Sequence, residues 1–233
     1  MYIRLNRVIS SMKFDSKARQ IFKKLPNEVK NYFYEVDEKC KKHKINFRLS
    51  GGKGLNADGA RCGGWFDDSN KELAIALDMP LKWSLSILLH EESHLDQWLD
   101  PTSVWYNYGI YNSFPRFFSW LTKESELRNP LKEARKIIIL EADCEKRTLR
   151  KIKKRWSHII DFEVYSRSAN AYMFSYLWMA KTRKWIGSCV KQHYFLKNFP
   201  IKMQKQYEFL PEKYLKLFLI QENKKPLPKR EGA

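Results

Sequence analysis

The chain has 233 residues, of which 43% are hydrophobic and 15% aromatic, so it carries enough apolar side chain to exclude wholesale disorder. Lys and Arg number 44 against 26 Asp and Glu, and the formal net charge of +18 favours polyanionic partners such as nucleic acid. The sequence predicts no membrane span, no signal peptide and no cysteine framework, since no long apolar run and no closely spaced cysteine pair occurs. A reducing cytoplasm is the expected compartment.

The first hundred residues predict short helices and then short strands. The pattern places two helices in 15–44, separated near Pro26, because a proline is tolerated at a helix start. Glycines at 51, 52, 54 and 59 mark an irregular loop after the first strand. The expected strands are 45–50, 61–66 and 72–77, the last two joined by a turn at 67–70.

The rest of the chain predicts helices. The periodicity indicates a helix over 81–99, a loop over 100–118, a long helix from the capping pair Asn129-Pro130 to about 156, and another over about 162–185. Helices, a small sheet and then helices are typical of the α+β class. We expect an N-terminal helical extension (1–44), a catalytic domain (45–185) and a C-terminal helical extension with a basic tail (186–233).

The predicted helix 81–99 carries the sequence His90-Glu91-Glu92-Ser93-His94. Residues four apart share a helix face, so His90 and His94 can bind one zinc ion from successive turns. Glu91 is about 100° from His90 and can deprotonate a zinc-bound water. Glu92 is about 200° away and is assigned to the outer face. The alternative is a chance match, because such short patterns are common.

Three apolar side chains, Trp83, Ile87 and Trp98, lie near the two histidines on the helical wheel, so this face is predicted to be buried. Catalytic zinc normally has three protein ligands, and the apolar stripe of the long helix is interrupted by Glu141 and Glu145.

Because a buried carboxylate needs a partner, Glu141 is the predicted third ligand and Glu145 the acceptor for a ligand histidine N–H. Pairing of both glutamates with buried Arg or Lys is the alternative, and Cys144, which also faces inward, is an alternative ligand. Asp143 is assigned to the solvated face with neighbouring basic residues.

These residues resemble the zincin metallopeptidases, and within them the gluzincins. The resemblance spans about 46–155 and matches His90, Glu91 and His94, then Glu141 and Glu145. It implies a zincin-like domain in which the strand at 72–77 is the sheet edge that binds an extended peptide. Leu140 stands where gluzincins typically have asparagine. The amino-acid sequence around both motifs also resembles metallopeptidases of tailed phages. This resemblance implies that the protein is located in the host cytoplasm or in the virion.

Two weaker patterns complete the predictions. Tyr165, Tyr172 and Tyr176 share one stripe of a helix, and Tyr172 is the candidate donor to a tetrahedral oxyanion, with aromatic core packing as the alternative. The segment 146–155 has seven basic residues in ten, which indicates either a polyanion contact or a solvated helix end.

The sequence therefore predicts a Zn²⁺-dependent metallopeptidase that hydrolyses peptide bonds of a peptide or protein substrate. One alternative is a zincin-derived basic protein that binds nucleic acid or another polyanion, or assembles into a larger, virion-like particle. Another is a zinc hydrolase that acts on a non-peptide bond.

Overall fold

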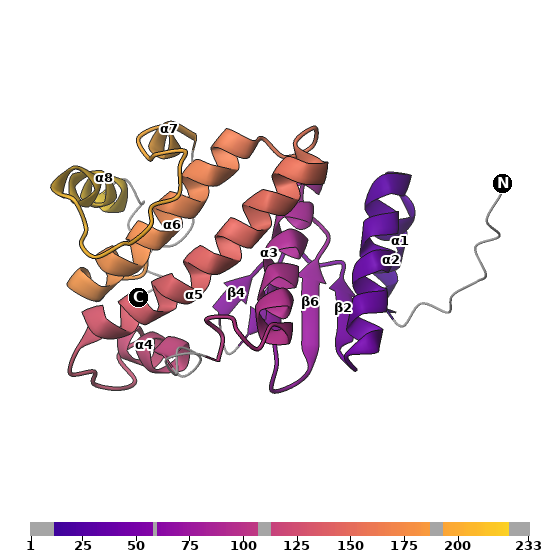
Figure 1. Cartoon of the computed structure of the whole chain (residues 1–233), viewed down its shortest axis with the longest axis horizontal. Helices are drawn as coiled ribbons and strands as arrows, with labels where there is room; N and C mark the ends of the chain where they lie inside the picture. Colours follow the sequence, from indigo (N-terminus) through magenta and orange to yellow (C-terminus); the bar gives the residue numbers. More distant parts are fainter. Residues whose placement is uncertain (1–11, 58–59, 107–112, 187–192, 224–233) are drawn as a thin grey trace, which may run out of the picture. The chain divides into compact units, whose positions relative to one another are not determined.

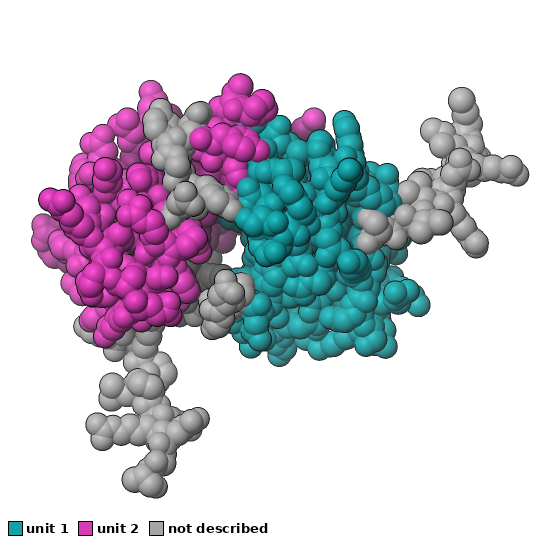
Figure 2. All heavy atoms as spheres, turned by 90° about the horizontal axis from the view of Figure 1, so that it is seen from below, with its two compact units in different colours: residues 1–100 teal, residues 101–233 magenta. Residues whose placement is uncertain are grey.

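The computed structural model describes residues 12–57, 60–106, 113–186 and 193–223. The chain divides into two compact units, residues 1–100 and residues 101–233, coloured teal and magenta in Figure 2. Unit 1 holds a small sheet with helices, and unit 2 is helical (Figure 1). The mixed α and β content agrees with the predicted class, whereas the unit boundary at residue 100 groups the helices of 15–44 with the sheet.

The sheet of unit 1 has the strand order β1-β2-β6-β5. Strands β1 (Lys13–Phe14), β2 (Asn46–Ser50) and β6 (Glu72–Ala76) run parallel, and β5 (Gly64–Asp67) is antiparallel to β6. The predicted edge position of 72–77 is wrong, because β6 pairs with β2 on one side and β5 on the other. The sheet ends at β1 on one side and at β5 on the other, so the edge strand next to β6 is β5.

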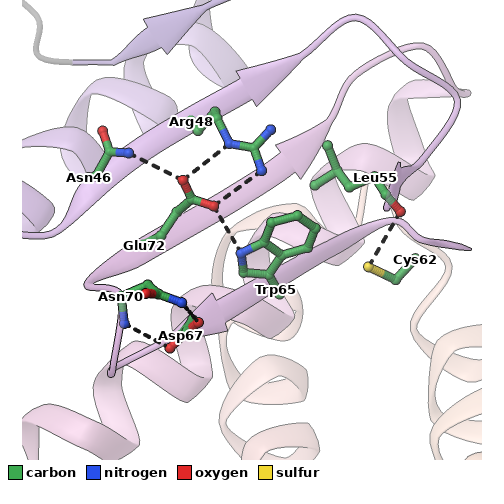
Figure 3. Close-up of polar contacts among 8 residues, drawn as sticks. All are labelled: Asn46, Arg48, Leu55, Cys62, Trp65, Asp67, Asn70 and Glu72. Atoms are coloured by element: carbon green, nitrogen blue, oxygen red, sulfur yellow. Dashed lines mark hydrogen bonds and ion pairs between the residues drawn. The ribbon is translucent and has the colours of Figure 1, made fainter. Parts of the chain in front are cut away.

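The two faces of this sheet differ in chemistry. Phe47 on β2 lies on the apolar face, where its ring stacks on Phe33 with centroids 6.1 Å apart. On the opposite face the Glu72 carboxylate accepts hydrogen bonds from Arg48, Asn46 and Trp65, all drawn in Figure 3. A charged residue on β6 is therefore satisfied by donors from both neighbouring strands.

Helices α1 (Ser16–Lys23) and α2 (Asn27–Lys42) confirm the two helices predicted in 15–44. Asp15 caps α1, because its side chain accepts from the Ala18 amide at 2.7 Å, and Pro26 precedes the first turn of α2. Phe33, on α2, packs against β2. The capping signals were readable in the sequence, whereas the contact of Phe33 with Phe47 places α2 on the apolar face of the sheet.

The predicted turn at 67–70 is confirmed, because Asp67 Oδ1 accepts from the amides of Ser69 and Asn70 at 2.8 and 3.0 Å. The predicted strand 61–66 is divided at Gly63 into β4 (Ala60–Cys62), which pairs with β3 (Leu55–Ala57), and β5. A Cβ at Gly63 would lie 2.3 Å from Ile87 Cδ1. A side chain here would displace the end of Ile87, so this junction packs closely on helix α3 (Leu81–Leu99), the helix that carries both histidines.

Unit 2 is built on two long helices, α5 (Pro130–Lys151) and α6 (Phe162–Thr182). Asn129 caps α5 by accepting from the Lys132 amide at 3.0 Å, as the Asn-Pro pair predicts. The helix continues to Trp156, as predicted, but its last turn, η2 (Ile152–Trp156), is π-helical. The predicted loop 100–118 is wrong from Ser113 onward, where α4 (Ser113–Leu121) begins, and 107–112 lie outside the described residues.

The core of unit 2 is aromatic. Phe174 of α6 lies against Tyr214, with ring centroids 4.5 Å apart, and Phe199 stacks on the same tyrosine at 4.7 Å. Short helix α7 (His193–Leu196) and helix α8 (Glu212–Asn223) cover this core. Among the described residues, no helix is both long and apolar enough to cross a membrane.

Candidate metal centre

Helix α3 begins directly after Pro80 and places its apolar residues against the sheet of unit 1. Leu85, Leu88 and Leu89 are fully buried, and Trp98 lies 5.9 Å from Phe66 on β5, measured between ring centroids. Leucines spaced three and four apart make the helix amphipathic and fix its rotation about its own axis. That rotation determines where the histidines point.

His90 and His94 lie on successive turns of α3 with their Nε2 atoms 3.2 Å apart. The two rings are nearly perpendicular, at 87°, and their centroids are 4.7 Å apart. Two nitrogens bound to one tetrahedral zinc at 2.0–2.1 Å would be separated by about 3.3 Å. The observed separation therefore allows both histidines to bind a single ion. His94 is buried and His90 is half-buried.

Gln97 fixes the orientation of the second histidine. Its side-chain oxygen accepts a hydrogen bond from His94 Nδ1 at 2.8 Å, and the residue is completely buried. With the proton held on Nδ1, the lone pair of His94 is on Nε2, the atom that faces His90. Sequence reasoning gave this supporting role to Glu145 and missed Gln97, although a polar residue three positions after His94 was a readable signal.

Glu91 is half-buried beside the histidines. The pKa of the Cys62 thiol is raised by burial and, next, by the negative charge of Glu91, so this carboxylate lies near the end of β4. Gly63 and Gly64 follow directly and meet Ile87 of α3. The carboxylate thus belongs to the part of α3 that faces the β4–β5 junction.

The outer-face prediction for Glu92 is wrong. Its side chain is 5% exposed, Tyr32 and Lys39 of α2 donate to its two carboxylate oxygens, and Lys39 also binds Asp96 at 2.9 Å. Glu92 lies four residues after the buried Leu88, on the same side of α3, and helix α2 covers this side. Trp83, predicted to be buried, is 45% exposed.

We expect Lys39→Met to lower the free energy of unfolding by about 2–3 kcal/mol, because it leaves the buried Glu92 carboxylate without its cation. Burial lowers the pKa of Lys39, but the charges of Glu92 and Asp96 outweigh burial and raise it above 10.5. The stabilisation is therefore complete below pH 10.5 and is lost as the pH rises through the higher folded-state value.

Urea unfolding at pH 7 and at a pH well above 10.5 measures both effects, with Lys42→Met, an exposed lysine of the same helix, as the matched control. An unfolding free energy equal to that of the control at pH 7 would contradict a stabilising role for Lys39.

In unit 2, the buried face of α5 carries three residues with metal-binding side chains. Glu141 and Glu145 are 6% and 5% exposed, and Cys144 is fully buried. Asp143 points away from them and binds Arg147 at 2.8 Å on the partly solvated side. The helical register inferred from the sequence is therefore correct for this stretch.

The predicted tyrosine stripe of α6 faces these carboxylates. The pKa of Tyr172 is raised well above its usual value by burial and then by the charge of Glu141, and the hydroxyls of Tyr172 and Tyr176 lie 2.6 Å apart. Burial also raises the pKa of Tyr165, whose hydroxyl donates a hydrogen bond to Glu145. Glu145 is thus held by a phenol, and the oxyanion role of Tyr172 stays a prediction.

Within the described residues, one group could hold a metal ion: His90, His94 and Cys144, whose ligand atoms all lie within 4.8 Å of one another. The group contains the alternative ligand, Cys144, and does not include Glu141, whose ligand role stays a prediction. No protein-family model, curated protein or solved structure matches the chain.

Proposed function

We propose that the chain is a zinc-dependent hydrolase that cleaves peptide bonds. The observation that carries the proposal is the pair His90 and His94, with Nε2 atoms 3.2 Å apart and Glu91 beside them on the same helix. A purely structural metal centre has no need of that glutamate. Two histidines, a carboxylate base and one further ligand are the donor set of a catalytic zinc with an open position.

Two imidazoles and a thiolate form a donor set that suits zinc better than calcium or magnesium, which prefer oxygen ligands. His90, His94 and Cys144 would hold the ion, with Glu141 as the alternative third ligand. Zinc bound there would act as a Lewis acid that polarises the scissile carbonyl and lowers the pKa of a water towards about 7.

Glu91 is the proposed general base. Its carboxylate accepts a proton from the attacking water and delivers that proton to the leaving amine, so the same side chain acts twice. Gln97 keeps the His94 ring in the tautomer that presents Nε2. Glu92, turned toward Lys39 and Tyr32, has no part in this chemistry and instead anchors α3 to α2.

The position of β5 at the end of the sheet supports a peptide as the substrate. An extended peptide can add to a sheet edge through main-chain hydrogen bonds, and β5 is followed by the hairpin to β6 that leads into α3. We assign to β5 the role that the sequence gave to 72–77.

We expect the protein purified without added metal to contain one zinc per chain, measured by elemental analysis. His90→Ala and His94→Ala should each lower zinc content below about a tenth of an equivalent, since two protein ligands hold zinc far less tightly than three. The matched control is His158→Ala, an exposed histidine in unit 2, which should keep the full equivalent.

Incubation of the zinc-loaded protein with a degenerate peptide library, read by mass spectrometry, tests the reaction. New N-termini are expected with the wild type and not with His94→Ala. A protein that takes up no zinc contradicts the metal centre. One equivalent of zinc together with hydrolysis of esters or other non-peptide bonds only would keep the centre and contradict the substrate.

A further inference from the structure

The positive charge of the chain is concentrated in unit 2. Residues 101–233 contain 27 Lys and Arg against 12 Asp and Glu, a formal charge of +15, whereas residues 1–100 contain 17 against 14. The candidate metal ligands His90 and His94 and the candidate base Glu91 belong to unit 1. The excess charge therefore calls for an explanation separate from hydrolysis.

Part of this charge forms a defined surface, which we call the basic stripe: Lys146, Arg150, Lys153 and Lys154. All four side chains are exposed, and none of them makes an ion pair among the described residues. The segment 146–160 contains no Asp or Glu. Arg147, by contrast, is bound to Asp143 and is not part of the stripe.

The turn η2 continues the stripe beyond α5. Ile152 and Trp156 are buried at 0% and 1% exposure, and the three residues between them are all exposed. Two buried residues four apart leave the three residues between them free to face solvent, so a basic arc lies beside this buried anchor. Arg155, the third residue of the arc, lies over the Trp156 ring at 5.0 Å.

The spacing of the stripe suits a regular polyanion. At 1.5 Å per residue, Lys146 and Arg150 are separated by about 6 Å along the axis of α5. Double-stranded nucleic acid presents one charge per about 1.7 Å of its axis, so a row of cations on one helix face can meet several phosphates without a precise register.

The surroundings argue against an anionic membrane. Helices that bind membrane interfaces insert large apolar side chains beside their basic ones. Among the described residues, the exposed large hydrophobics nearest the stripe in sequence are Ile139 and Trp185, and none lies between them. The apolar residues of η2 are buried in unit 2 and are not available for insertion.

We propose that the basic stripe binds the phosphate backbone of double-stranded nucleic acid without sequence preference. The contact is electrostatic, through Lys146, Arg150, Lys153 and Lys154. It does not depend on the metal centre or on hydrolysis.

The test uses the full chain and a fluorescently labelled random-sequence DNA duplex, with the dissociation constant measured by anisotropy at several salt concentrations. Replacing the four stripe residues by Gln should weaken binding at least ~10-fold at low salt and lower the slope of log K against log salt by roughly 3–4, because each contact contributes about 0.9.

The matched control replaces Arg128, Lys132, Lys181 and Lys205 by Gln, which removes the same four charges from exposed positions of unit 2 elsewhere. It should change the slope by less than about 1. Replacing the three stripe lysines by Arg keeps the charge and should retain binding, which separates loss of contact from loss of folding. The thermal midpoints of all variants are compared by circular dichroism.

If the stripe and control variants lose the same affinity for the DNA duplex, net charge alone attracts DNA and the proposal is overturned. So would binding to heparin or to vesicles of anionic lipid without binding to duplex DNA. Zinc content and peptide hydrolysis of the stripe variant should equal those of the wild type. The DNA-binding result can therefore be interpreted even if the protein proves not to be a hydrolase.

Discussion

Glu91→Gln is expected to abolish peptide hydrolysis while leaving the zinc in place. The amide keeps the size of the side chain but cannot accept the proton of the attacking water, and loss of a general base typically costs 10²–10⁴-fold. The histidines and Gln97 do not change, so metal content should stay at one equivalent. Turnover of the peptide identified in the library, together with elemental analysis, measures both.

The neighbouring glutamate supplies the matched control. Glu92→Gln is the same substitution one residue further along α3, but its side chain is bound by Tyr32 and Lys39. We expect it to lower stability and to leave turnover per folded molecule unchanged. Wild-type turnover in Glu91→Gln, or equal loss in both variants, would show that Glu91 is not the base.

Much of the fold was predictable because its signals are local. Asp15 and Asn129 cap their helices through side chains that accept from amides three residues later, and the turn after β5 is stabilised by Asp67. The spacing of leucines in α3 sets its buried face, and the fixed turn of the helix then places His90 and His94 on roughly the opposite side. Such signals depend only on neighbours in the sequence.

The incorrect predictions depend on contacts between distant residues. Glu92 shares a helix face with the buried Leu88, but its cation, Lys39, is 53 positions earlier in the sequence, and only the fold brings the two together. Strand β6 is not an edge strand, because β2 pairs with it on one side and β5 on the other, and the strand sequence alone does not reveal both partners. A sequence pattern predicts a helix or strand and its buried face, but not the elements that pack against it.

The third metal ligand shows the same limit at the level of one helix. Glu141 and Cys144 are three residues apart on α5, about 60° apart around its axis, so both lie on its buried face. Periodicity separates them from Asp143 and cannot separate them from each other. A thiolate is a softer donor than a carboxylate and suits zinc well, so Cys144 is our first choice.

We therefore expect Cys144→Ser to weaken zinc binding by more than the ~10–100-fold that loss of a supporting residue typically costs. Glu145→Gln should fall within that range, because the sequence predicts that this carboxylate accepts from a ligand histidine N–H. Asp143→Ala, on the opposite side of α5, is the control and should leave the affinity unchanged. Competition with a chelator of known zinc affinity ranks the variants.

Cobalt substitution decides between the two candidate ligands. A thiolate bound to Co²⁺ produces an intense charge-transfer absorption in the near ultraviolet, whereas a carboxylate does not. We expect the Co²⁺-loaded wild type and Glu141→Gln to show this band, and Cys144→Ser to lose it. If the wild type lacks the band and Glu141→Gln no longer binds metal, the carboxylate is the ligand, as the gluzincin resemblance implies, and Cys144 is only a buried neighbour. A band that persists in Glu141→Gln makes the centre a His-His-Cys site, and the glutamates of α5 then serve to hold the tyrosines of α6.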